Sequence, residues 1–556
     1  MRFLIKFLNP NQKLVQKQEQ IQVKKISNYK KTLFLLTFIN YFWNLQKLVK
    51  IKKFFQKKLF NFIKVMKIMS KLNDQQQFRR DKLKNLVKNG FNFPSSTFEH
   101  DNLVEINEKF SQKSKQFFLE NQVKIAFAGR LIRQRGPFFI IFSQNLQFQA
   151  YISKEFQKKN EFIFANLDLG DIIEVSGYLF KTQTGQLSIK VNNFSLLTKS
   201  LHPLPDQYYG IENPDEKYRK RYLDLLVNSE SAKTFRLRSK IISLIRTFFD
   251  SQGFLEVDTP VLQPVLGGAS AKPFITYYNS LSQNFYLRIA TELPLKKLLV
   301  AGFDRVYEIG KIFRNEGFDS THNPEFTSIE FYQAYANLEK IMDQTENLFR
   351  FLFEKLNLDP ANFDFSNKKI NFLEKFARYD MIEITSKLMN FDLKSANFAD
   401  LVEKAKKEGV KIEPFFKKGH LINKFFEKFV EPTLINPTFI IGHPIEISPL
   451  AKSNPNNPNF TLRAELFICG KEFANMFDEL NDPIDQLSRF QAQIIEKNQG
   501  NQEASEIDNE FVQALEYGMP PAGGCGIGID RLTMLLTKNE SIREVILFPQ
   551  LKPKKD

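Results

Sequence analysis

The segment from residue 314 to residue 336, RNEGFDSTHNPEFTSIEFYQAYA, concentrates side chains that could bind a charged ligand. Arg314 and Glu316 stand two residues apart, a short polar loop with His322 follows, and four residues then recur at two-residue spacing: Phe326, Ser328, Glu330 and Tyr332. Residues two apart on a strand face the same side, so a hairpin across the loop would bring both rows onto one sheet surface. A guanidinium, a ring and carboxylates there could hold an amino acid beside ATP. Alternating polar residues are also typical of a solvent-exposed strand face, and the hairpin alone leaves both interpretations open.

Length and composition set broad limits on the fold. The 556 residues have room for two or more domains, and hydrophobic and charged fractions of 42% and 25% are those of a soluble globular protein. The two cysteines, Cys469 and Cys525, cannot build a disulfide framework, and neither lies in a CxxC zinc motif. A reduced, cytoplasmic setting is therefore expected.

The net charge of +17 is concentrated in the first 68 residues, which hold 15 Lys and one Arg against the single acid Glu19. The high charge therefore says little about what the folded body binds. The apolar run LFLLTFINYFW (33–43) is too short to span a bilayer, and the basic stretch before it is a poor signal-peptide start. A mis-assigned start codon or a disordered or helical tail is favoured over a surface-binding basic helix, and no stable membrane association is expected.

The chain changes character three times after this tail. Residues 69–120 carry amphipathic, charged runs that indicate a helical segment, and residues 121–200 contain about five short strand-like runs separated by turns. Such a block suits an OB-type β-barrel, although any small sandwich or barrel fits the pattern. Residues 201–214 include the linker LHPLPD, and residues 215–556 mix long helices with separated strands, which predicts an antiparallel α+β domain with a helical insertion at about 375–432.

Three short motifs occur in order within this last region: GFLEVDTP (253–260) after a long helix, FRNE (313–316), and GIGIDR (526–531) opening a helix. Each is weak alone, and GCGIG could be mistaken for a nucleotide-binding loop, although it lacks the GxGxxG spacing. Together they resemble motifs one, two and three of the class II aminoacyl-tRNA synthetases. The flanking segments LGGASAKPF, RIATELPLKKL, FANMFDELNDP and LEYGMPPAGGCGIGIDRL resemble the lysyl-tRNA synthetases of that class, over about residues 75–552.

The resemblance implies an antiparallel-sheet catalytic domain behind an OB-type barrel, and an enzyme that activates L-lysine with ATP and transfers it to lysine tRNA. Attack of the lysine carboxylate on the α-phosphate brings like charges together, so charge neutralisation is the main task. The family places Arg314 on the carboxylate and α-phosphate, which suits a planar guanidinium that stays charged. It also implies roles in ATP binding for Glu316 and Phe326 at the adenine, His322 and Arg531 at the β- and γ-phosphates, and Asn323, with Arg314 and Arg531 as the catalytic pair.

Glu465 and Glu472 match the family's magnesium ligands, which hold up to three Mg²⁺ ions together with phosphate and water. Their spacing of seven would face them oppositely on one strand, so a turn at Cys469–Gly470 is required. Two surface glutamates beside a hairpin remain the alternative. The lysine-binding residues implied by the family are Gly268, Glu292 and Glu330 around the α-amino end, and Tyr332, Asn475 and Glu479 around the side chain.

For tRNA, the resemblance implies anticodon contacts by Phe139, Gln149 and Gln186 in the barrel. Family members commonly have Glu at the position of Gln186, and barrel packing is the alternative role for Phe139. Motif one, around the long helix and Pro260, implies a homodimer. Two rival functions are disfavoured. An enzyme that lysylates proteins would lack the barrel, and a nucleic-acid-binding OB protein with an inactive second domain would not be expected to retain Arg314, Glu316, Glu465, Glu472 and Arg531 together.

Overall fold

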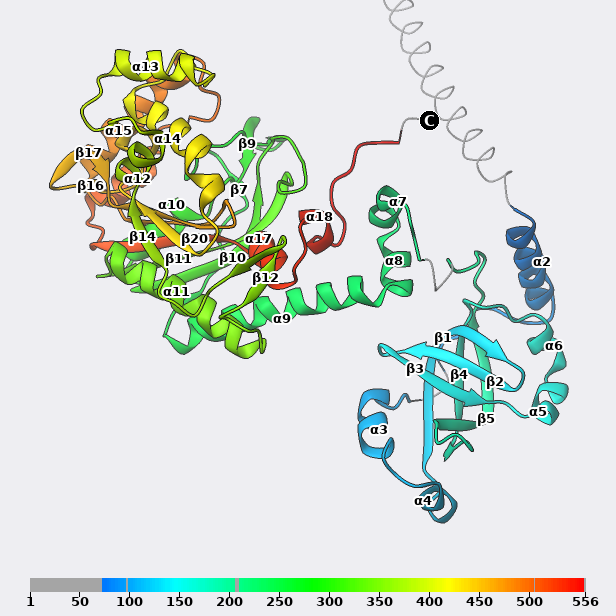
Figure 1. Ribbon diagram of the computed structural model, residues 1–556. Helices are drawn as coiled ribbons and strands as arrows, with labels where there is room; N and C mark the ends of the chain where they lie inside the picture. The colour runs from blue at the N-terminus through cyan, green and yellow to red at the C-terminus, as the bar shows by residue number, and fades with distance from the viewer. Residues whose placement is uncertain (1–72, 97–98, 206–209, 505, 555–556) are drawn as a thin grey trace, which may run out of the picture. The chain divides into compact units, whose positions relative to one another are not determined.

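The computed structural model describes residues 73–96, 99–205, 210–504 and 506–554 (Figure 1). It divides into two compact units, residues 1–204 and 205–556. The basic tail 1–68, with its alternatives of a mis-assigned start and a disordered or helical segment, lies outside the described residues. None of the helices among those residues is long and apolar enough to cross a membrane.

The first unit contains a closed five-stranded barrel with strand order β1-β2-β3-β5-β4, in which β3 and β5 run parallel. Its interior is filled by fully buried side chains such as Phe127, Ile141 and Ile173. Gly177 lies at a β-bulge where β4 passes β5 too closely for any Cβ. The strands are β1 (Lys124–Arg135), β2 (Phe138–Ser143), β3 (Leu146–Tyr151), β4 (Ile172–Lys181) and β5 (Leu187–Thr198), with α5 (Lys154–Lys159) and α6 (Glu161–Ala165) between β3 and β4. The expectation of an OB-type barrel is confirmed.

Short helices precede the barrel, as the sequence predicts: α2 (Asp74–Lys88), α3 (Leu103–Phe110) and α4 (Lys115–Glu120). A capping box formed by Asn73 and Gln76 starts α2. Arg79 then donates to the carbonyls of Leu169 and Ser200, and Lys82 forms an ion pair with Asp168, so α2 is fixed to the barrel by polar contacts.

The second unit is built on an eight-stranded, mainly antiparallel sheet with the order β14-β15-β18-β19-β20-β11-β10-β6. The two motif-two strands pair in register from Arg305↔Gln333 to Phe313↔Glu325, and β20 pairs with β11 on the other side. The strands are β6 (Leu255–Glu256), β10 (Arg305–Phe313), β11 (Glu325–Ala334), β14 (Ala377–Asp380), β15 (Thr438–Ile441), β18 (Arg463–Ile468), β19 (Lys471–Asp478) and β20 (Ala522–Gly528). Small sheets are formed by β7 (Leu262–Gln263), β8 (Ile275–Tyr278) and β9 (Gln283–Leu287), by β12 (Phe363–Phe365) and β13 (Lys368–Ile370), and by β16 (Ser453–Asn454) and β17 (Asn457–Thr461).

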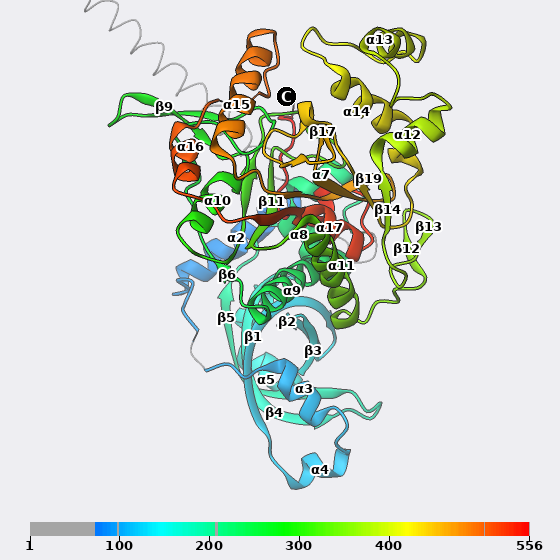
Figure 2. The ribbon, with the colours of Figure 1, turned by 90° about the vertical axis from the view of Figure 1, so that its left-hand side faces the viewer.

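One face of the sheet is covered by helices, of which α9 (Ser229–Ser251) and α11 (Leu338–Lys355) lie side by side (Figures 1 and 2). The long helix begins at Asn228, whose side chain accepts from two backbone amides, and buries one stripe that includes Ile241, Ile245 and Phe249. Ile329 and Phe331 of β11 join this core. The remaining helices are α7 (Pro214–Arg219), α8 (Arg221–Val227), α10 (Glu292–Val300), α12 (Met381–Met389), α13 (Phe398–Lys407), α14 (Lys418–Phe429), α15 (Pro483–Asn498), α16 (Asn509–Glu516), α17 (Ile529–Leu536) and α18 (Ile542–Val545), with short 3₁₀ turns η2 (Glu431–Thr433) and η3 (Ile445–Ile447).

The predicted helical insertion at 375–432 needs one correction at its start. Residues 377–380 form β14, which pairs in parallel with β15 at the edge of the main sheet. The helices α12, α13 and α14 follow it and pack around a core of their own that includes Leu401, Leu421 and Phe425. The insertion is therefore anchored to the main sheet by a strand, and its helices begin at Met381.

Candidate active site

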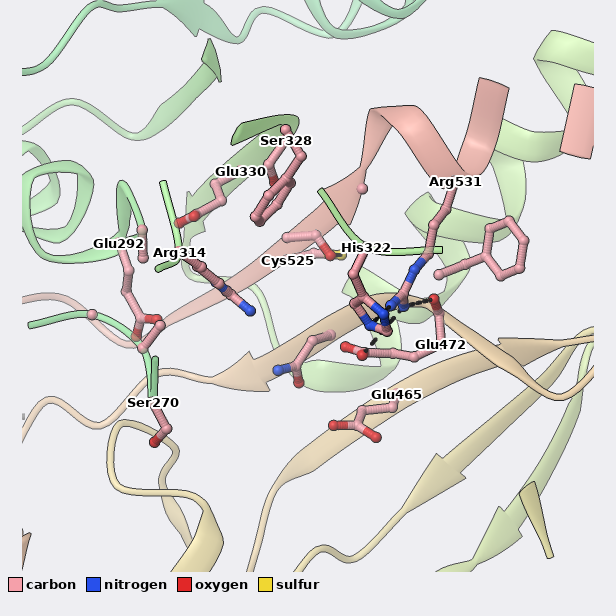
Figure 3. A pocket seen from close by; sticks show the side chains of 18 of the residues that line it. Ser270, Glu292, Arg314, His322, Ser328, Glu330, Glu465, Glu472, Cys525 and Arg531 are labelled. Carbon is pink, nitrogen blue, oxygen red and sulfur yellow. Dashed lines mark hydrogen bonds and ion pairs between the residues drawn. The ribbon is translucent and has the colours of Figure 1, made fainter. Parts of the chain in front are cut away.

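The face of the sheet opposite α9 and α11 holds a cavity of about 420 Å³. Alternation along β11 explains its position, because Ile329 and Phe331 enter the core while their neighbours line the cavity. Thirteen of the fourteen residues implied in ATP, lysine or metal binding line this one cavity: Gly268, Glu292, Arg314, Glu316, His322, Asn323, Phe326, Glu330, Tyr332, Glu465, Glu472, Asn475 and Arg531. The Glu292 and Glu330 carboxylates lie toward one side in Figure 3, and Glu472, His322 and Arg531 lie toward the other.

Arg314 and Glu316 lie in the loop after β10, which ends at Phe313, so the expectation that they share a strand face is wrong. The hairpin nevertheless continues past the strand, because the Arg314 amide donates to the Pro324 carbonyl at 2.8 Å. The Arg314 guanidinium lies 5.3 Å from the ring centroid of Phe326. Its Nε is buried and has no hydrogen-bond partner among the described residues. The Arg314 guanidinium in the cavity therefore has a hydrogen-bond donor that is available to an anionic ligand.

A second cationic cluster lies at the opposite end, where Arg531 stands in the first turn of α17. Arg531 Nη1 donates to the Glu472 carbonyl at 2.6 Å, and Nη2 lies 3.3 Å from His322 Nε2. His322 Nδ1 lies 3.0 Å from an oxygen of Asp319. Although partial burial opposes it, hydrogen bonds from Thr321 and His322 hold the pKa of Asp319 below its usual range. Asp319 therefore stays ionised and orients His322.

Asp530, next to Arg531, ties α17 to two other elements. Its Oδ2 accepts from the Thr327 amide of β11 at 2.7 Å, and its Oδ1 lies 2.5 Å from Arg238 of α9. Arg238 also donates to the Thr327 hydroxyl at 3.1 Å. Asp530 of the third motif thus joins the motif-two hairpin to the long helix that precedes motif one.

Glu465 and Glu472 lie on neighbouring strands, as the predicted turn requires. Cys469 and Gly470, with φ of 51° and 68°, form the turn between β18 and β19, and a register shift follows Leu466. Glu465 pairs 2.5 Å from Arg463, a residue that the sequence analysis missed, and Glu472 Oε2 lies 3.7 Å from Arg531. Desolvation and the Glu465 charge raise the pKa of Glu472.

This pair fits a hard divalent cation. Two like-charged carboxylates face one cavity, and a cation between them would relieve the repulsion that disfavours ionised Glu472. Among the described residues no cluster of three or more His, Cys, Asp or Glu side chains is placed to hold a metal. A magnesium ion at Glu465 and Glu472 would therefore need further oxygen ligands from a substrate or water.

The end of the cavity away from Arg531 and Glu472 is acidic. Glu330 Oε1 accepts from the Thr291 amide at 3.1 Å, and Oε2 accepts from the Tyr332 hydroxyl at 3.0 Å. Burial, reinforced by the Glu292 charge, raises the pKa of Glu330 to about 7. Glu292 opens α10 and is itself buried. A cationic group of a ligand would stabilise the ionised forms of both carboxylates.

Glu479 differs from the other predicted residues because it lies behind the cavity wall, 1% exposed and just past the end of β19. Its Oε2 forms an ion pair at 2.5 Å with Lys296, which also lies 2.5 Å from Glu292 Oε1. Apart from this ion pair, neither Glu479 oxygen has a hydrogen-bond partner among the described residues. Gly524 is required here, because a Cβ would collide with both Glu479 Oε1 and the Tyr332 ring.

The barrel residues predicted to read an anticodon are not equally exposed. Phe139 is fully buried in the barrel core and packs against Phe164, so its predicted role as a stacking surface is wrong. Gln149 is partly exposed and Gln186 is exposed. Phe138 alternates to the outer face, where its ring lies 5.3 Å from Tyr151. All of β2 is apolar or aromatic up to Ser143, so alternation in the sequence could not separate the inner ring from the outer one.

Comparison with known proteins agrees with this geometry. A family model described as tRNA synthetases class II (D, K and N) matches residues 213–552. The chain is 99% identical to a lysine–tRNA ligase of Mesomycoplasma hyopneumoniae (strain 7448) over 491 residues, which cover 88% of this chain and 100% of that protein. The chain belongs to the lysine–tRNA ligase family.

The similarity holds for more distant members of the family. A lysine–tRNA ligase of Metamycoplasma arthritidis (strain 158L3-1) is 54% identical over 87% of this chain and 98% of its own length. One from Staphylococcus aureus (strain MW2) is 48% identical over 87% of this chain and 99% of its own length. Family membership makes the chain an aminoacyl-tRNA ligase of class II, and the α+β fold expected for that class is confirmed.

Proposed function

We propose that this chain activates L-lysine with ATP, forming lysyl-adenylate and pyrophosphate, and then transfers lysine to the 3′ end of lysine tRNA. The observation that carries this function is the single cavity with cationic groups at one end and buried carboxylates at the other. A ligand with two ammonium groups and a carboxylate matches the acidic end and Arg314, and a triphosphate matches the cluster of His322 and Arg531.

In the first step, a lysine carboxylate oxygen bonds to the α-phosphorus while the bond to the pyrophosphate oxygen breaks. Both groups are anionic, so Arg314 between them lowers the barrier by neutralising charge that grows in the transition state. His322, oriented by Asp319, and Arg531 would hold the departing pyrophosphate. Phe326 offers a flat surface for adenine beside the guanidinium of Arg314, and Glu316 and Asn323 line the same cavity.

Glu465 and Glu472 are the residues that would hold up to three Mg²⁺ ions, together with phosphate oxygens and water. Bound there, the metal would supply positive charge to the phosphate oxygens. Arg463 keeps Glu465 in place through its 2.5 Å contact and also donates to Asn475 Oδ1 at 3.0 Å. This chain's own part is thus to hold two carboxylates facing the cavity.

The amino-acid end would bind lysine through Gly268, Glu292 and Glu330 near the α-amino group, and through Tyr332, Asn475 and Glu479 near the side chain. Gly268 has φ of +90° and lies against Ala290, so a side chain there would be strained and would crowd the recess. For tRNA, we assign the stacking surface to Phe138 in place of Phe139, with Gln149 and Gln186 as hydrogen-bonding partners. A cytoplasmic location accords with two free cysteines among the described residues and with this role in translation.

The decisive test is lysine-dependent ATP–pyrophosphate exchange followed by charging of tRNA. We expect exchange with lysine, and transfer of labelled lysine to lysine tRNA by the same preparation. Exchange without tRNA charging would favour the protein-lysylating rival, and absence of exchange would favour the inactive nucleic-acid-binding rival. Aspartate and asparagine serve as control substrates, because the acidic recess should repel the side-chain carboxylate of aspartate and would be left without its second cation by the neutral amide of asparagine.

We further propose a homodimer built around motif one. Exposed apolar side chains occur in motif one and in the small sheet that follows it: Leu255 on β6, Leu262 on β7, and Ile275 and Tyr277 on β8, the last two being 62% and 57% exposed. Exposed apolar side chains of this kind favour an interaction site, and a second copy fits because motif one forms the two-fold interface in the class.

Replacing both Ile275 and Tyr277 by aspartate should convert the dimer to a monomer, because two buried charges on each side of the axis would face one another. Light scattering should give twice the chain mass of 65.1 kDa for the parent protein and the single mass for the variant. Tyr517→Asp, at an 81% exposed position at the end of α16 and outside the small sheet, is the matched control. A parent protein that is monomeric at all concentrations would contradict the proposal.

A further inference from the structure

A lysine of the protein itself lies between the two groups of carboxylates that are proposed to bind the substrate. Lys296, on α10, is fully buried, and its Nζ lies 2.5 Å from both Glu292 Oε1 and Glu479 Oε2. It also donates to the Leu450 carbonyl at 3.4 Å. Lys296 does not line the cavity, so it is not a ligand in the ordinary sense.

The charges around this residue balance only when a diamino acid is bound. The recess contains three buried carboxylates, Glu292, Glu330 and Glu479, and one buried ammonium, Lys296. With the carboxylates ionised it therefore carries a net charge of −2. The α- and ε-ammonium groups of lysine supply two positive charges, while the lysine carboxylate goes to Arg314. Buried charges are costly unless paired, so this count favours a ligand with two ammonium groups over one.

Each of the two carboxylates that Lys296 contacts has two oxygens with different surroundings. One oxygen of each is bound to Lys296, and the other remains for a ligand. Glu479 Oε1 has no hydrogen-bond partner among the described residues and packs against Gly524 and Tyr332, directly behind the cavity wall. Because Glu292 and Glu479 come from α10 and from the end of β19, a single cation fixes their relative position.

We infer that Lys296 is a positioning residue for substrate recognition, which holds Glu292 and Glu479 in place and sets the recess to accept the two ammonium groups of one diamino acid. The inference rests on the proposed function and adds a residue to it. Lys296 touches neither substrate nor ATP in this role, so its effect is confined to the amino-acid end.

The pH dependence of lysine binding provides a readout that a purely structural role would not change. Burial raises the pKa of Glu479 to about 8, against the opposing effect of Lys296, and raises the pKa of Glu330 to about 7. Both must be ionised to bind ammonium groups, so the KM for lysine should fall as pH rises through this range and then level off. The charged and titratable groups around Lys296 are Glu292 of the same helix, Glu330 and Tyr332 of β11, Arg463 of β18, and Asp478 and Glu479 at the end of β19.

The experiment compares the full-length protein with Lys296→Met and with the matched control Lys297→Met. Lys297 is the next residue, is one-third exposed and makes only 3.8 Å ion pairs with Asp508 and Glu510. Pyrophosphate exchange is measured over lysine and ATP concentrations between about pH 6 and pH 9. We expect Lys296→Met to raise the KM for lysine about 100-fold, with the KM for ATP changed less than about threefold. Its lysine KM should still be falling at the highest pH, because three carboxylates without an internal cation ionise later.

A second pair of measurements guards against loss of folding. Lys296→Arg keeps the cation and should bind lysine more tightly than Lys296→Met. Lys296→Ala should regain lysine use when propylammonium is added, whereas neutral propanol should have no effect, because only the cation restores the charge.

The outcomes separate this inference from the proposed function. Exchange by the parent protein, with an unchanged lysine KM and pH profile in a folded Lys296→Met variant, would overturn the inference alone. Equal increases in the KM values for lysine and ATP would overturn it as well. A parent protein that shows no lysine-dependent exchange would overturn the proposed function and the inference with it.

Discussion

Replacing Arg314 by lysine should lower the rate of lysine-dependent pyrophosphate exchange about 1000-fold, the scale seen when one preorganised donor to a charged transition state is lost. The substitution keeps the charge but removes the planar fork that can bond a carboxylate and a phosphate oxygen together. It also removes the guanidinium that stacks beside Phe326 and the buried Nε that has no partner among the described residues. Turnover should therefore fall much more than substrate affinity.

Arg305→Lys is the matched control for this variant. Arg305 starts β10, the strand that leads into the Arg314 loop, and its exposed side chain donates to the Gln252 carbonyl. Single-turnover measurement of adenylate formation, together with thermal unfolding of both variants, separates a chemical defect from a loss of stability. Adenylate formation by Arg314→Lys within tenfold of the parent rate would show that this guanidinium does not stabilise the reacting groups.

Glu479→Gln should raise the KM for lysine by about 100-fold or more while leaving the KM for ATP within about threefold. Removing one partner of a buried charge pair commonly costs ~3–5 kcal/mol, and here the loss leaves Lys296 with Glu292 alone. The amide can also no longer offer a full negative charge to a ligand ammonium behind Tyr332. Titration of lysine at saturating ATP, and of ATP at saturating lysine, gives the two values.

Glu516→Gln tests whether loss of an exposed carboxylate on nearby α16 has any such effect, and none is expected. The informative quantity is the ratio of the change in the KM for lysine to the change in the KM for ATP. If Glu479→Gln weakens lysine and ATP use equally, Glu479 supports the whole cavity and is not part of a lysine-specific recess.

Much of the fold follows from local sequence signals, and its departures from prediction have identifiable causes. The long helix α9 is evident because Ile241, Ile245 and Phe249 recur on one face and Gly253 ends the segment. The strand β14 was assigned to a helical insertion because four residues, ARYD, carry no alternation of their own. Its structure is imposed by pairing with β15, which lies some sixty residues further along the chain.

The positions of the cavity residues can be predicted where they belong to a sequence motif. They are harder to predict where side-chain packing determines which residues are buried. The placement of Glu465 and Glu472 followed from a required turn, which Cys469 and Gly470 provide with positive φ. Alternation cannot show that the Phe139 ring is buried, because both faces of β2 are apolar and only closure of the barrel determines which ring lies inside. Lys296 gave no signal, since a lysine four residues after a glutamate ordinarily forms an exposed helix pair.

Asp530 joins α9, β11 and α17 through Arg238 and Thr327. None of these segments can separate from the others without leaving a desolvated charge unpaired. The segments that carry the nucleotide-binding groups should therefore unfold together with the sheet and α9 in one cooperative transition. Local unfolding of single loops is not expected. A ligand bound at this cavity would then protect α9 against proteolysis and heat, even though most of that helix never touches it.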